Sequence, residues 1–264
     1  MRAVSLLLAL AACAPKDPAA IRREADVREA PKWESEAGRR EVWRDIARWS
    51  IDNGVAGDAL DMVRRLREAG EDSPELTVIQ ARALNAQGLH TEARLALDEL
   101  LAKQPRNADA HRALGVVLAD LGELDRAITA LSRSLDLEAD DVPTRNNLGF
   151  LLLAAGRCPE AVAELERCVT ADGSKPRYRN NLAFALVCTG DSQRALQLFR
   201  STATTEAEAR YQVGLAYERL DSLVAARNHY EQSVRIDPQY QPALDALARL
   251  DEPTPPTPSP GDSP

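Results

Sequence analysis

Apolar side chains recur every three or four positions through most of the chain, which is the spacing of one face of an α-helix. In residues 108–141 the pattern fills two stretches separated by a short polar break, with apolar residues at Leu114, Leu118, Leu121, Ile128, Leu131 and Leu135. The pattern predicts two amphipathic helices joined by a tight turn. Because one such pair cannot bury its own apolar face, we expect several pairs to stack and share a continuous core.

This arrangement repeats with a period of 34 residues: residues 145–156 read RNNLGFLLLAAG and residues 179–190 read RNNLAFALVCTG. Glycines, alanines and other small residues each recur at this interval, except that the last step is 31 residues because the fifth unit is three residues short. The glycines are Gly54, Gly88, Gly122, Gly156 and Gly190, with Asp221 in the same place in the last unit; the alanines are Ala59, Ala93, Ala127, Ala161, Ala195 and Ala226; the small residues are Ala47, Ala81, Gly115, Gly149, Ala183 and Gly214. A glycine suits the end of the first helix of each pair, and small residues allow the helices to pack closely.

The period, the helix-turn-helix form and the small-residue pattern resemble the tetratricopeptide repeat family. The residues that carry the resemblance are Leu114-Gly115, Leu148-Gly149, the turn glycines with the alanines that follow them, and the closing Pro105 and Pro238. The resemblance implies an all-α fold, a right-handed superhelix (α-solenoid) of about six helix-turn-helix repeats. We expect repeats at 40–73, 74–107, 108–141, 142–175, 176–206 and 207–240, followed by a capping helix at 241–250.

The two ends of the chain differ from the repeats. Residues 1–12 have the basic start and short apolar run of a secretory signal peptide. Leu10-Ala11-Ala12-Cys13 resembles the bacterial lipobox, which implies lipidation of Cys13; the alternative is an ordinary signal peptide with an incidental cysteine. Residues 13–39 are expected to form the lipidated N-terminus and a flexible tether, and residues 251–264 a disordered, proline-rich tail.

The composition excludes several classes of function. The net charge is -8, and no basic patch of the kind that binds nucleic acid is evident. No catalytic motif or metal-ligand spacing occurs, and the glycines are explained by turns and packing. We therefore expect no catalytic residues, no metal, no cofactor, no small-molecule substrate and no nucleic acid, and we interpret the chain as a non-enzyme.

Three cysteines remain after Cys13. Cys158 and Cys168 are ten residues apart on one expected helix, about 15 Å along its axis, which is too far for a disulfide. Cys158 begins the second helix of the fourth unit and Cys188 ends the first helix of the fifth, so stacking would make these two ends neighbours. A Cys158–Cys188 disulfide is one hypothesis, favoured by an oxidising compartment. Three buried thiols acting as apolar fillers are the other.

The resemblance also implies a concave face built from the first helix of each repeat. In the duplicated phrase the positions that face this groove in the family include Asn146, Asn147, Phe150, Asn180, Asn181 and Phe184. Their amides could hydrogen-bond an extended backbone and the two Phe rings could hold an apolar side chain. The alternative is that the asparagines are ordinary family residues and the rings pack between helices.

Among lipid-anchored tetratricopeptide repeat proteins, the chain looks most like the TadD lipoproteins of the bacterial tight-adherence pilus, on the residues Asn146-Asn147-Leu148-Gly149 and Arg179-Asn180-Asn181-Leu182. The type IV pilus pilotins come second, and a general periplasmic adaptor for envelope enzymes is a third possibility. The resemblance implies a scaffold that binds a peptide or helix of a protein partner in its concave groove. It also implies a place in the bacterial cell envelope, lipid-anchored to the outer membrane and facing the periplasm, with the lipid as its one membrane contact.

Overall fold

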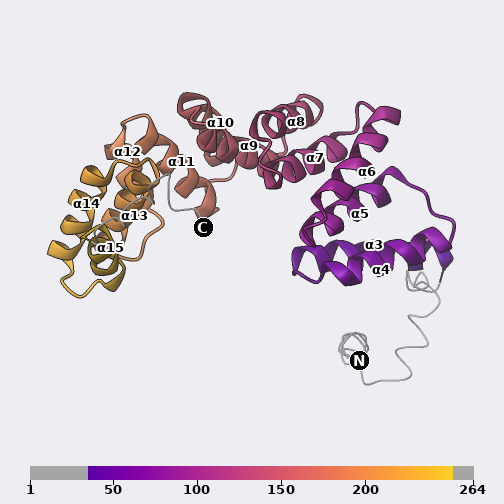
Figure 1. Cartoon of the computed structure of the whole chain (residues 1–264), viewed down its shortest axis with the longest axis horizontal. Coiled ribbons are helices and arrows are strands. Elements are labelled where there is room, and N and C mark those ends of the chain that lie inside the picture. The colour runs from indigo at the N-terminus through magenta and orange to yellow at the C-terminus, as the bar shows by residue number, and fades with distance from the viewer. Residues whose placement is uncertain (1–34, 252–264) are drawn as a thin grey trace, which may run out of the picture. The chain divides into compact units, whose positions relative to one another are not determined.

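The computed structural model describes residues 35–251, and within this range every regular element is an α-helix (Figure 1). The signal peptide, Cys13, most of the expected tether and almost all of the expected tail therefore lie outside the described residues. The described chain divides into two compact units, with the division between Ile79 and Gln80 inside one helix.

The first unit contains α3 (Glu36–Asp52), α4 (Ala56–Glu68) and the first turns of α5 (Pro74–Ala86). Its apolar centre is built from Ala47, Ala59, Val63, Leu66 and Leu76, all of which are almost completely buried. At its surface, the Arg44 guanidinium lies 3.1 Å from the Glu71 carboxylate.

In its described residues, 80–251, the second unit contains the rest of α5 and ten further helices that follow one another as antiparallel hairpins. They are α6 (His90–Lys103), α7 (Ala108–Asp120), α8 (Leu124–Leu137), α9 (Val142–Ala154), α10 (Cys158–Ala171), α11 (Pro176–Cys188), α12 (Ser192–Arg200), α13 (Glu206–Arg219), α14 (Leu223–Ile236) and α15 (Gln241–Asp251). Each helix from α6 to α15 packs against the next one in the chain, and α11 also packs against α9 and α13. The fold is an all-α solenoid of stacked hairpins.

Glycine ends the first helix of every described hairpin except the last, because the turn requires a left-handed backbone. Gly156 has φ 71°, and the next residue, Arg157, donates its N–H to the Leu152 carbonyl at 2.8 Å, which closes the helix end. Asp221 takes the same place after α13 with φ 56°, and Ser222 donates to the Tyr217 carbonyl at 2.9 Å. The periodic turn residues thus have the conformation that their spacing predicts.

The small residue of each hairpin lets its two helices approach closely. A Cβ atom added to Gly149 would lie 2.6 Å from Leu165 Cγ, and one added to Gly214 would lie 2.6 Å from the Tyr230 ring. Contacts below 3 Å do not occur between real carbon atoms, so the large side chain of the second helix fills the space that glycine leaves. This pairing of small with large residues holds each hairpin together.

A candidate peptide-binding hollow

The first helices of three successive hairpins, α9, α11 and α13, enclose an open hollow of about 220 Å³. Its walls are Phe150, Leu153, Ala154, Asn181, Phe184, Ala216, Arg219 and Leu220. Phe150 is 52% exposed and Leu220 is 40% exposed, so apolar surface faces solvent there. Exposed apolar side chains gathered in a concavity, with a few polar groups among them, are typical of a binding site.

Three of the six groove residues predicted from the sequence line this hollow: Phe150, Asn181 and Phe184. Phe150 and Phe184 occupy equivalent places in α9 and α11, and they form its aromatic walls. The Phe184 ring is held from behind, because it meets the Phe199 ring edge-on at 5.5 Å between centroids. The face that the hollow offers is therefore set by packing inside the fifth hairpin.

The other three predicted residues do not line the hollow. Asn146 is only 5% exposed, and its Oδ1 accepts a hydrogen bond from Asn181 Nδ2 at 2.9 Å. Asn180 Oδ1 accepts one from the Thr202 hydroxyl at 2.7 Å, which turns it toward the end of α12. These two amides position their neighbours, because burial and existing hydrogen bonds leave them little capacity for a ligand.

Asn147 differs from its neighbour because its side chain is exposed on α9. It lies one turn before Phe150, and residues three apart share a helix face. No hydrogen bond involves its amide among the described residues. Asn147 is thus an available donor and acceptor beside the hollow.

The third wall, on α13, contains the residues that the sequence reasoning missed. The Arg219 guanidinium carbon lies 4.9 Å from the centre of the Phe184 ring, a cation–π contact between α13 and α11. The guanidinium is exposed and has no carboxylate partner within residues 35–251, whereas Arg44 and Arg112 each pair with acids. Arg219 stands two residues before the turn residue Asp221, as Ala154 stands before Gly156, and none of the six groove residues predicted from the sequence occupies that position.

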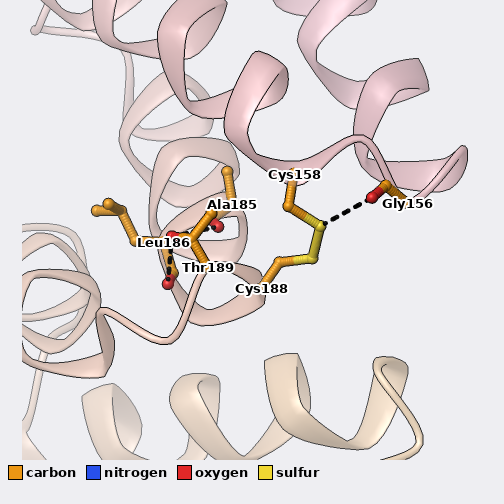
Figure 2. The surroundings of a disulfide bond; sticks show 6 residues. All are labelled: Gly156, Cys158, Ala185, Leu186, Cys188 and Thr189. Carbon is orange, nitrogen blue, oxygen red and sulfur yellow. Dashed lines mark hydrogen bonds between the residues drawn. A yellow bond between two sulfur atoms is a disulfide. The ribbon is translucent and has the colours of Figure 1, made fainter.

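The two hairpins that carry the duplicated phrase are also linked covalently. A disulfide joins Cys158 at the start of α10 to Cys188 at the end of α11, with 5.9 Å between the Cα atoms (Figure 2). The Cys158 sulfur lies 3.5 Å from the Gly156 carbonyl oxygen, so the link begins directly beside a turn glycine. Cys168 is free and buried. From the repeat pattern we expected the start of α10 and the end of α11 to be neighbours, and the disulfide joins these two helix ends.

Other kinds of site find little support in the part of the chain that the structure describes. Within residues 35–251 no group of three or more His, Cys, Asp or Glu side chains is arranged to hold a metal ion. None of the helices in that range is both long enough and apolar enough to span a bilayer. The exposed Phe150 and Leu220 and the polar Asn181 and Arg219 make the hollow between α9, α11 and α13 the candidate site.

Solved structures of several proteins share the fold. YrrB, described as a TPR protein with an unusual peptide-binding site, superposes with a TM-score of 0.55 at 20% identity, covering 70% of this chain and 96% of its own. Pseudomonas aeruginosa pilF gives 0.59 at 16% identity, covering 80% and 97%. TTC0263 of Thermus thermophilus, a thermophilic TPR protein, gives 0.55 at 21% identity, covering 68% and 99%. At these identities the likeness shows the fold alone.

The sequence comparisons identify the family. No curated protein matches the chain. Family models described as "Tetratricopeptide repeat" match residues 51–100, 80–142 and 147–205, and a further one matches 207–240. These ranges include every residue that lines the hollow. The chain belongs to the tetratricopeptide repeat family.

Proposed function

We propose that the protein is a scaffold that binds an extended segment of a partner protein in the hollow between α9, α11 and α13. The observation that carries the proposal is the composition of the hollow, in which two Phe rings, the Asn181 amide and an unpaired arginine converge from three successive repeats. Stacked-repeat proteins bind partners on extended concave surfaces of this kind. YrrB, which shares the fold, has a peptide-binding site.

Each wall suits a different part of a peptide. The rings of Phe150 and Phe184 offer apolar surface to one side chain. The Asn147 amide can donate to and accept from a peptide backbone whatever its sequence, and Asn181, which uses one N–H on Asn146, keeps its Oδ1 and its second N–H for the same purpose. Arg219 favours an acidic group on the peptide, because its charge has no partner in the described chain. The hollow would thus select an apolar residue close to an acid.

A photocross-linking experiment tests this proposal. The photoreactive residue p-benzoylphenylalanine replaces Phe150 in the full chain, and in a matched variant it replaces Arg167, which is exposed on α10 and outside the hollow. We expect ultraviolet light to link the Phe150 variant to a partner protein, and the linked peptide to be identifiable by mass spectrometry. A peptide of that sequence should bind Phe150→Ala about tenfold more weakly than wild type. Equal linking from both positions would contradict the proposal.

We further propose that the scaffold is lipid-anchored through Cys13 in the bacterial cell envelope, at the outer membrane, and assists assembly of a pilus or secretin machine of the tight-adherence kind. The support is sequence alone: the lipobox-like residues 10–13 and the repeated phrases near Asn147 and Asn181. Metabolic labelling with an acyl-chain analogue should mark wild type and leave Cys13→Ala unmarked. The cross-linked partner separates this role from that of a type IV pilus pilotin or a general periplasmic adaptor.

A further inference from the structure

The chain leaves its last described helix close to the hollow. α15 ends at Asp251, and the Arg249 side chain pairs with Glu218 at 2.8 Å. Glu218 is next in sequence to Arg219, which lines the hollow. α15 itself is fixed in place, because Ala246 packs in one buried cluster with Ala226 and Tyr230. The Asp251 carboxylate pairs with Arg227 of α14 at 2.6 Å, so whatever follows Asp251 starts beside the first turns of α14, the helix that comes directly after Leu220 of the hollow wall.

The segment that follows is long enough to cross all three walls. Residues 252–264 read EPTPPTPSPGDSP. In a polyproline II conformation a chain advances about 3.1 Å per residue, so this segment can reach about 40 Å. Packed helices lie about 8–10 Å apart, so the path from α13 across α11 to α9 needs about 20 Å. The length is sufficient with residues to spare.

The chemistry of the segment matches that of the hollow. It contains Pro253, Pro255, Pro256, Pro258, Pro260 and Pro264. Proline-rich segments bind aromatic-lined grooves because their extended form is already ordered and loses little entropy on binding. Their carbonyl groups have no internal partners and can accept hydrogen bonds from the amides of Asn147 and Asn181.

The charge of residues 252–264 is also complementary to that of the hollow. Residues 252–264 contain Glu252 and Asp262 and no lysine or arginine. Arg219 is the cation on the hollow wall, and within the described residues no carboxylate neutralises it. An acidic, proline-rich ligand that is attached a few residues away is therefore complementary to this site in both shape and sign.

We infer that residues 252–264 fold back and occupy the hollow of the same chain, so that a partner peptide must displace them before it binds. This inference rests on the proposed function of the hollow as a peptide site. Attachment gives the segment an effective concentration on the order of millimolar. If its own dissociation constant is about 0.1 mM, a competing peptide should bind the full chain about tenfold more weakly than a chain that ends at Asp251.

The first test is a cross-link within the purified protein. With p-benzoylphenylalanine at position 150, we expect ultraviolet light to join that residue to residues 252–264 of the same chain, and no such product with the photoreactive group at position 167. The yield should not depend on protein concentration. A yield that rises with concentration would assign the contact to a second copy and overturn the inference, as would the absence of a link to residues 252–264.

The second test measures the competition directly. A synthetic peptide EPTPPTPSPGDSP should bind the chain ending at Asp251, and bind the full chain about tenfold more weakly. A peptide of equal charge with Pro255, Pro256 and Pro258 replaced by alanine should bind neither. Equal affinity of the proline-rich peptide for the two chains, or no binding to either, would overturn the inference.

Arginine variants supply a matched control. Arg219 and Arg177 are both exposed and each stacks on one aromatic ring, at 4.9 Å and 5.0 Å, but Arg177 does not line the hollow. Arg219→Gln should weaken binding of the proline-rich peptide about threefold or more, and Arg177→Gln should leave it unchanged. Equal effects of the two variants would remove the charge complementarity on which the inference depends.

The tests separate failure of the inference from failure of the proposed function. If a partner peptide binds the hollow with equal affinity in both chain lengths, the inference fails and the proposed function stands. If no partner peptide reaches position 150 in either chain length, the proposed function fails.

Discussion

One residue position shows how the hairpins vary a common contact. Ser134 and Ser233 occupy equivalent places in the third and sixth hairpins, and each donates its hydroxyl to the carbonyl of a residue at the start of the same hairpin, Ala108 at 2.9 Å and Ala207 at 2.7 Å. Cys168 takes this place in the fourth hairpin, with its sulfur 3.7 Å from the Val142 carbonyl oxygen. The Cys168 thiol thus forms a weaker version of the hydrogen bond that the serine hydroxyl forms in the other two hairpins.

The environment of Cys168 leads to a pH prediction. Burial raises the pKa of its thiol from 9.0 to about 11. Between these values the unfolded chain has lost the thiol proton and the folded chain keeps it, so ionisation favours unfolding. We expect the urea midpoint of wild type to decrease between pH 9 and pH 11 by more than that of Cys168→Ser, because the serine at position 168 does not ionise in this range. Parallel pH profiles for the two proteins would show that the thiol is not protected by burial.

The same protection predicts the chemistry of Cys168 at neutral pH. A thiol is nucleophilic only as the thiolate, and a raised pKa keeps Cys168 protonated. Iodoacetamide at pH 8 should leave Cys168 unmodified in the native protein and modify it in urea.

The Cys158–Cys188 disulfide gives a second prediction at this scale. Because it closes a loop over a sequence separation of 30 residues, the chain-entropy model gives a stabilisation of about 3 to 4 kcal/mol. The double variant Cys158→Ser, Cys188→Ser should lose about that free energy of unfolding in urea. When denatured wild type is alkylated, prior reduction should increase the number of alkyl groups found by mass spectrometry by two. An alkylation count that reduction leaves unchanged would mean that the cysteines are not paired.

The exposure of the individual asparagines at the site could not be predicted from the sequence. The helical period assigns Asn146, Asn147, Asn180 and Asn181 to one broad face of two helices. Whether an amide on that face is exposed depends on how far each hairpin rotates against the next, and small rotations bury Asn146 while leaving Asn147 in solvent. This rotation cannot be inferred from the residue types. The aromatic walls were therefore predictable from the sequence, whereas the roles of the individual amides were not.

At the scale of the helix, the fold depends on the match between a small residue, glycine or alanine, and a large side chain in each hairpin. Gly149→Ala places a methyl group against Leu165, where the added carbon would lie 2.6 Å from Cγ. Overpacking of this kind costs about 1–3 kcal/mol, and the better helix propensity of alanine offsets about 0.5–1 kcal/mol. We expect a net loss of about 1 kcal/mol or more in chemical denaturation.

Asn147→Ala is the control for this prediction. It changes an exposed residue of the same helix to the same amino acid, so stability should stay within about 0.5 kcal/mol of wild type or rise slightly. An equal loss in the two variants would show that the close approach at Gly149 is not what limits the side chain there.

At the scale of the whole molecule, the periodic signals were sufficient to predict an all-α stack of hairpins with left-handed turns. The prediction succeeded because each hairpin packs its two helices in the same way, with a small residue against a large side chain and a left-handed turn residue between the helices. The boundary between the two compact units inside α5 was not predicted, since the periodic small residues continue through it without interruption. The α13 wall of the hollow was missed because the sixth repeat lacks the duplicated phrase.

The last helix predicts how the stack ends. Ala246 is fully buried against Tyr230, whereas Ala248, two residues later, is exposed. Ala246→Glu would bury a charge without a partner, which costs several kcal/mol, so α15 should detach and uncover the Tyr230 cluster. Ala248→Glu should have no effect. Analytical ultracentrifugation should show self-association of the first variant alone, and monomers of both would argue that α15 does not cover the core.

The disulfide also determines how a pulling force would pass through this part of the molecule. Tension that enters at one end of the chain reaches Cys158, crosses the sulfur–sulfur bond and continues from Cys188, so residues 159–187 carry none of it. Asn181 and Phe184 lie in that bypassed segment. When the chain is pulled from its two ends, helices outside this loop would therefore unfold first, and the part of the hollow wall formed by Asn181 and Phe184 would keep its shape under load.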